Sequence, residues 1–154
     1  MKIKRIVTDN RKKIFLLDCA NHRYSFPYAK LHLKPKVSDP IASVIIDSEL
    51  GSEAFTYRLK SGREDSIHLD AVLEYNKDPE YLREQILYKL SLCAQRQLKK
   101  TQLTKREIVR RLKTSPTQLY RLLDQTFYGK TIDQMLRLLH VLGTSVDIVT
   151  KKAA

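Results

Sequence analysis

Residues 103–124 read LTKREIVRRLKTSPTQLYRLLD, a basic stretch in which two helices are expected to begin. Each start is marked by a capping box, a Ser or Thr followed three residues later by Glu or Gln, whose side chains satisfy the free N–H groups of the first turn. The two boxes are Thr104–Glu107 and Ser115–Gln118, and a third, Thr131–Gln134, follows them. The first two leave room for a helix of about two turns, a tight turn and a second helix start. This spacing predicts a helix-turn-helix.

The positive charge of the chain is concentrated in its second half. The 154 residues carry 29 Lys and Arg against 17 Asp and Glu, a net charge of +12. Residues 79–154 hold 15 basic and 6 acidic side chains, a balance of +9, whereas residues 1–78 hold 14 and 11, a balance of +3. Such asymmetry is typical of a protein that binds a polyanion through one half. A basic face that only promotes solubility is the alternative.

Composition argues against several other classes of protein. No run approaches the ~18 apolar residues of a membrane-spanning helix, and no signal peptide is recognisable. Cys19 and Cys93 are far apart and the histidines have no metal-ligand spacing, so we predict no disulfide, metal site or cofactor. No glycine-rich phosphate loop or nucleophile accompanies the few carboxylates near turns. We therefore expect a cytoplasmic protein that is not an enzyme and does not enter a membrane.

The first half has the alternation and turn signals of β-structure. Phe15, Leu17 and Cys19 fall on one face of a run, and Asn21-His22 is predicted as the turn of a two-residue hairpin. Gly62 suits a second hairpin turn, and Asp70–Tyr75 adds a helical turn. We expect four or five short strands, drawn from the runs Ile3–Thr8, Ile14–Ala20, Arg23–Phe26, Ile41–Asp47, Phe55–Leu59 and Ser66–Leu69.

The second half has helical spacing. Asp78 is predicted as the cap and Pro79 as the first residue of a helix that runs to about Lys100. Its apolar stripe consists of Leu82, Ile86, Leu90 and Cys93, widened by Leu87 and Ala94. Further helices are expected over Thr104–Lys113, Pro116–Leu123 and Thr131–Leu142, then a left-handed cap at Gly143 and a strand over Ser145–Thr150. The predicted fold class is α+β, with a small β-rich domain over residues 1–78 and an all-α domain with a short C-terminal strand over residues 79–154.

The second of the two close helices has the residues of a base-reading helix. Leu119, Leu122 and Leu123 form its apolar stripe, so the opposite face is left to polar side chains. Arg pairs well with guanine, Gln with adenine, and a proline can contact a thymine methyl group. The predicted base-reading residues are Pro116, Thr117, Gln118, Tyr120 and Arg121. The predicted phosphate contacts are Lys105, Arg106, Ser115 and Lys130.

The stretch from Leu103 to Asp124 resembles the lambda-repressor-like (XRE-type) helix-turn-helix family. The continuation through Leu142-Gly143-Thr144-Ser145-Val146-Asp147-Ile148 is similar to its antitoxin branch, in which a Leu-Gly-x-x-Val-x-Ile segment is typical. This chain has Lys113 where the family usually has a turn glycine, and we expect Lys113 in a left-handed conformation. The resemblance implies a lambda-repressor-like domain, repression of the protein's own operon and a possible cognate toxin. The first half more loosely resembles a small bacterial β-rich domain of unknown function.

The leading hypothesis is therefore a sequence-specific regulator that binds double-stranded DNA. Readers of this kind usually work as dimers, and the edge of the Ser145–Thr150 strand could pair with that of a second copy. One alternative is a protein-interaction module whose helical half no longer reads DNA. A less favoured one is RNA binding, with Tyr24, Phe26 and Tyr28 as a base-stacking platform.

Overall fold

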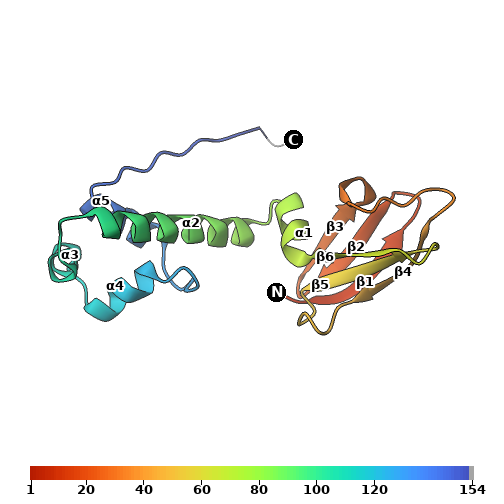
Figure 1. Ribbon diagram of the computed structural model, residues 1–154, viewed down its shortest axis with the longest axis horizontal. Coiled ribbons are helices and arrows are strands. Elements are labelled where there is room, and N and C mark those ends of the chain that lie inside the picture. The colour runs from red at the N-terminus through yellow and green to blue at the C-terminus, as the bar shows by residue number, and fades with distance from the viewer. Residues whose placement is uncertain (153–154) are drawn as a thin grey trace. The chain divides into compact units, whose positions relative to one another are not determined.

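In a computed structural model, which describes residues 1–152, the chain divides into two units. The first comprises Met1–Tyr81 and the second begins at Leu82 (Figure 1). The predicted boundary after residue 78 lies slightly earlier. The helix that contains this division, α2, starts in the first unit and continues into the second.

The first unit contains two antiparallel three-stranded sheets (Figure 1). One has the order β1-β2-β3 and the other β4-β5-β6, so each is a simple meander. A short 3-10 helix (Tyr28–Lys30) follows β3, and α1 (Leu69–Tyr75) follows β6. The strands are β1 (Ile3–Asp9), β2 (Ile14–Cys19), β3 (His22–Pro27), β4 (Ile41–Ile46), β5 (Ala54–Leu59) and β6 (Glu64–His68).

The first two-residue hairpin is shifted by one residue from its predicted position. Cys19 pairs with His22, so Ala20 and Asn21 form the turn, and Ala20 has a positive φ of 39°. The pairing is constrained because a one-residue slip would turn every buried side chain of a strand to the other face. The second hairpin has the predicted turn, with Gly62 at a φ of 88°.

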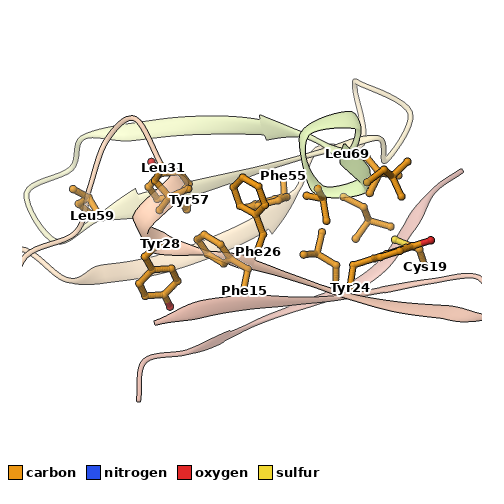
Figure 2. Close-up of a cluster of buried hydrophobic side chains, with 14 residues drawn as sticks. Phe15, Cys19, Tyr24, Phe26, Tyr28, Leu31, Phe55, Tyr57, Leu59 and Leu69 are labelled. Carbon is orange, nitrogen blue, oxygen red and sulfur yellow. The ribbon is translucent and has the colours of Figure 1, made fainter. Parts of the chain in front are cut away.

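An aromatic core lies between the two sheets (Figure 2). Phe15, Leu17 and Cys19 are buried, which confirms their predicted common face. The ring of Phe15 packs at 5.0 Å from that of Phe55 and at 5.6 Å from that of Tyr57, which come from the other sheet. Tilted pairs of this kind stabilise a core beyond the area they bury.

The start of α2 is fixed to the first sheet by Asp78. Its Oδ1 accepts a hydrogen bond from the Tyr81 backbone N–H at 2.9 Å, which confirms the predicted cap. Its Oδ2 accepts a hydrogen bond from the Tyr24 hydroxyl at 2.8 Å. Tyr24 is buried in the core, and this burial together with the Asp78 carboxylate raises the pKa of its hydroxyl.

Four helices form the described ordered part of the second unit: α2 (Pro79–Lys100), α3 (Lys105–Leu112), α4 (Pro116–Leu123) and α5 (Ile132–Val141). The buried stripe of α2 agrees with the predicted one only in part. Leu87 and Ala94 are buried, and Leu90 and Cys93 are half-buried against the same core, but Leu82 is 56% and Ile86 36% exposed. Ser91, which was not predicted to be buried, has a buried polar partner that is described below.

The predicted fold class was wrong in its second half. Ser145–Thr150 forms no strand, and Figure 1 shows the chain after α5 as an extended segment. The sequence alternates as predicted, but the described part of this unit contains no strand with which its backbone could pair. All six strands lie within residues 3–68, and α2 crosses the division between the two units, which follows Tyr81. The chain is a mixed α+β protein, and the predicted all-α, lambda-repressor-like domain is not shown.

Candidate nucleic-acid interface

Helices α3 and α4 are joined by three residues, and each begins at a predicted cap. The Thr104 Oγ1 accepts the Glu107 N–H, and the Ser115 Oγ accepts the Gln118 N–H, both at 3.2 Å. Between them Lys113 has φ 53° and ψ 47°, the predicted left-handed conformation. The reversal is closed by hydrogen bonds from the N–H groups of residues 113 and 114 to carbonyls of α3.

Only the third capping box is complete. The Gln134 side chain accepts a hydrogen bond from the Thr131 N–H at 2.9 Å, whereas the Glu107 carboxylate turns away from its cap. It accepts hydrogen bonds from Arg110 and Arg111 instead, at 2.6 and 3.0 Å. These bonds, with Arg110 the stronger influence, lower the pKa of Glu107 to about 2. The two arginines are therefore partly neutralised from within their own helix.

Helix α4 has one buried and one exposed face, as predicted. Leu119, Leu122 and Leu123 are buried in the core of the second unit. Pro116, Thr117 and the capping Ser115 are exposed, and so are Tyr120 and Arg121; Gln118 is half-buried. The side chains predicted to read bases thus share one solvent-facing side of a short helix.

The guanidinium of Arg121 packs against an aromatic ring from the loop after α4. It lies over Phe127 at 5.9 Å from the ring centroid, a cation–π arrangement. The Phe127 ring in turn packs against Gly129, where a Cβ would lie 2.7 Å from the ring. Sequence reasoning missed Phe127, because only the fold places this loop residue beside α4.

A second cationic group lies beside Tyr120 on the exposed face. The Lys105 Nζ is 5.0 Å from the centroid of the Tyr120 ring. A hollow of about 180 Å³ with mainly apolar walls lies between α3 and α4. Besides Lys105 and Tyr120, it is lined by Arg106, Val109 and Pro116. Lys105 and Arg106 are exposed at the N-terminus of α3, where the helix dipole also favours an anion.

The predicted phosphate contact at Lys130 is wrong. Its side chain is 0% exposed. The ammonium donates hydrogen bonds to the Ser91 hydroxyl at 2.6 Å, to the Leu122 carbonyl at 2.9 Å and to the Asp124 carbonyl at 2.5 Å. The last carbonyls of a helix have no hydrogen-bond donor within the helix, and at the end of α4 the Lys130 ammonium is that donor. Burial lowers the pKa of this ammonium.

Two further side chains that the sequence did not single out hold the same region. The Gln95 amide donates to the Leu123 carbonyl at 2.7 Å. The Arg83 guanidinium donates to the carbonyls of Tyr128 and Lys130, both at 3.0 Å. All three acceptors are backbone carbonyls, and no sequence motif marks a donor for such a group. The C-terminal end of α4 and the following loop are therefore fixed by α2.

The aromatic platform of the RNA alternative is absent. Tyr24, Phe26 and Tyr28 are buried in the core of the first unit and present no ring on which a base could stack (Figure 2).

Within the described residues, no helix has the length and apolar character needed to cross a membrane. Comparison of the chain with protein-family models, curated proteins and solved structures finds no match.

Proposed function

We propose that this chain is a sequence-specific regulator of transcription that binds double-stranded DNA through the exposed face of α4. The observation that carries the proposal is the arrangement of unpaired cations around that face. Arg121, Lys105 and Arg106 are exposed, and among the described residues none of them forms an ion pair with a carboxylate. Phosphates of a duplex would supply the missing counter-charge.

The contacts divide into two kinds by their position. Lys105 and Arg106 at the start of α3 suit phosphates, because backbone N–H groups and side-chain charge act together there. Thr117, Gln118 and Arg121 suit base edges in the major groove, and Pro116 and Tyr120 add apolar contact. A regulator of this kind acts as a repressor when its site overlaps a promoter, and it would work in the cytoplasm, where the DNA is.

We further propose that two copies bind together. The extended segment after α5 exposes apolar side chains, with Ile148 88% and Val149 81% exposed. A second copy is a suitable partner because paired extended segments satisfy each other's backbone groups, and a dimer gives two α4 helices for two half-sites. The resemblance to antitoxins makes a toxin a further expected partner.

The direct test is selection of random-sequence duplex DNA by the purified full-length protein. We expect enrichment of a two-fold symmetric motif. A matched pair of variants, Arg121→Ala on α4 and Arg96→Ala on α2, distinguishes the reading of bases from a general effect of net charge. Both variants remove one exposed arginine, but only the first removes it from α4. Enrichment should be reduced only by the first. Recovery of DNA without enrichment would contradict sequence-specific binding.

Dimer formation is tested by sedimentation of the full-length protein. Ile148→Asp combined with Val149→Asp should give monomers, whereas Ser145→Asp combined with Thr150→Asp adds the same charge and should leave the dimer intact. Equal effects of both pairs would contradict pairing through the apolar side chains.

The alternative function, a protein-interaction module, is favoured by the same exposed segment, because Ile148 and Val149 could equally bind a different protein. It predicts no affinity for duplex DNA even at low salt, together with a partner that co-purifies and is lost in the Ile148→Asp, Val149→Asp variant.

A further inference from the structure

The first unit contains a second basic site, formed by three separate segments. The turn between β1 and β2, the residues after β3 and the loop before β4 surround a hollow of about 560 Å³. Four lysines line it: Lys12, Lys13, Lys34 and Lys36. No acidic residue is among its lining residues. The volume is in the range typical of small-molecule sites, about 300–1,000 Å³.

None of the four lysines around this hollow forms an ion pair in the described part of the chain. Asp39 is paired with Arg63 at 2.9 Å. Asp9 accepts the neutral backbone N–H groups of Arg11 and Lys12 and keeps its charge, so one carboxylate near the turn stands against four lysines. An anion in the hollow would relieve the repulsion among the four ammonium groups.

The turn that carries two of these lysines is held in place. The Lys13 carbonyl accepts a hydrogen bond from the Tyr28 N–H at 2.9 Å, and the Tyr28 hydroxyl donates to Asn10 at 2.9 Å. Lys13 has a φ of 55°, a conformation that glycine or asparagine adopts at lower cost. A lysine therefore lines the hollow from a position where the backbone alone would favour a smaller residue.

Apart from the lysines and Asn10, the lining of the hollow is mainly apolar. Pro27, Tyr28 and Ala29 line one side, and Pro40 and Ile41 line another. A bare inorganic anion would use the lysines but leave this surface unoccupied. A ligand with an apolar ring or chain and an anionic group would use both.

We propose that this hollow binds a small amphipathic anion, a molecule with an apolar body and a carboxylate or phosphate group. The proposal does not depend on DNA binding by the second unit. It gives the first unit the role of a ligand-binding unit. A single-stranded nucleic acid is less suitable because the buried Tyr24 and Phe26 leave no stacking surface.

The probe for the test is 8-anilinonaphthalene-1-sulfonate, whose aromatic body and sulfonate match the two parts of the hollow and whose fluorescence rises on apolar burial. We expect full-length protein to bind one molecule. Lys12→Ala with Lys34→Ala should weaken binding by about ten- to a hundredfold, as expected for the loss of charge-assisted contacts. The matched control is Lys2→Ala with Lys4→Ala, which removes two exposed lysines of the same unit outside the hollow. Equal weakening in both would overturn the site.

A second variant leaves the charge unchanged. Ala29 is exposed on the wall of the hollow, so Ala29→Trp should fill it and displace the probe while the thermal unfolding midpoint stays near that of the wild type. Unchanged probe binding in this variant would also overturn the site.

Competition identifies the ligand chemistry. Octanoate or adenosine monophosphate should displace the probe, and the stronger of the two indicates a carboxylate or a phosphate ligand. Inorganic phosphate at the same ionic strength should not. Displacement by phosphate as effective as by octanoate, or displacement only by a hexaglutamate peptide, would replace the proposal with a simple charged patch or an acidic protein partner.

Discussion

The N-terminal end of α3 and the C-terminal end of α4 treat a neighbouring lysine in opposite ways. At the start of α3, Lys105 is exposed beside the Tyr120 ring and has no carboxylate partner among the described residues. At the end of α4, Lys130 is buried, and its ammonium donates hydrogen bonds to the Ser91 hydroxyl and to two backbone carbonyls. Both residues are lysines close to a helix start in the same basic half, and both were predicted as phosphate contacts.

The difference follows from what each end of a helix lacks. The N-terminus has free N–H groups, which local caps satisfy and which attract anions, so a nearby cation stays in solvent. The C-terminus has free carbonyls, which need donors, and a buried ammonium can supply several. Charge near a helix therefore predicts a nucleic-acid contact at the N-terminal end and must be doubted at the C-terminal end.

The largest effect is expected at the buried end. Lys130→Met should lower the free energy of unfolding by about 3 kcal/mol. Three buried acceptors lose a charged donor, at about 1.5–3 kcal/mol each, but removal of the buried ammonium also removes its desolvation cost and offsets part of this loss. Chemical denaturation measures the change. The control is Lys89→Met on the exposed side of α2, which should change stability by less than about 0.5 kcal/mol. A similar small effect at Lys130 would contradict its structural role.

Next in size is the loss of base readout on the exposed face. Arg121→Ala should weaken binding to the selected DNA site by about 1–3 kcal/mol and leave binding to random DNA nearly unchanged. Titration of labelled duplexes at fixed salt measures both. Equal losses on the two kinds of DNA would mean that Arg121 contacts phosphate, and unchanged binding to both would remove it from the interface.

A smaller effect is expected at the exposed N-terminal end. Lys105→Ala should reduce the slope of log affinity against log salt by about one unit, because one phosphate contact and its released counterion are lost. Lys89→Ala removes a lysine of the same unit from α2 and should leave the slope unchanged. If both variants reduce the slope equally, the reduction is caused by the lower net charge of the protein and not by the loss of a phosphate contact at the start of α3.

Local features were predictable from the sequence because their causes are local. The caps at Thr104 and Ser115, the left-handed Lys113 and Gly143, and the buried face of β2 each depend on a few neighbouring residues. The buried face of α4 followed from its leucine spacing in the same way.

Features that depend on distant residues were not predictable. Spacing correctly placed Leu87 and Ala94 of α2 in the core, but it also placed there Leu82 and Ile86, which are exposed. It could not show that Ser91 is buried with Lys130, which is 39 residues away. The alternation after Gly143 predicted a strand, but a strand needs a partner that the described part of this unit does not contain. The lysine hollow of the first unit joins three segments, and no one of them shows it alone.

The smallest predicted effect concerns Glu107 of α3, whose carboxylate partly neutralises Arg110 and Arg111. Its pKa in the folded protein, about 2, is below the ordinary value of 4.5, so the unfolded chain binds the proton more readily. The stabilisation is fully present above pH 4.5 and is lost as the pH falls towards 2. The stability difference between wild type and Glu107→Gln should therefore shrink over this range. Thermal unfolding at a series of pH values measures it, with Glu84→Gln on α2 as the control. A difference that stays constant from pH 6 to pH 2 would mean that Arg110 and Arg111 are not held by Glu107, and that both are free to join Lys105 at the interface.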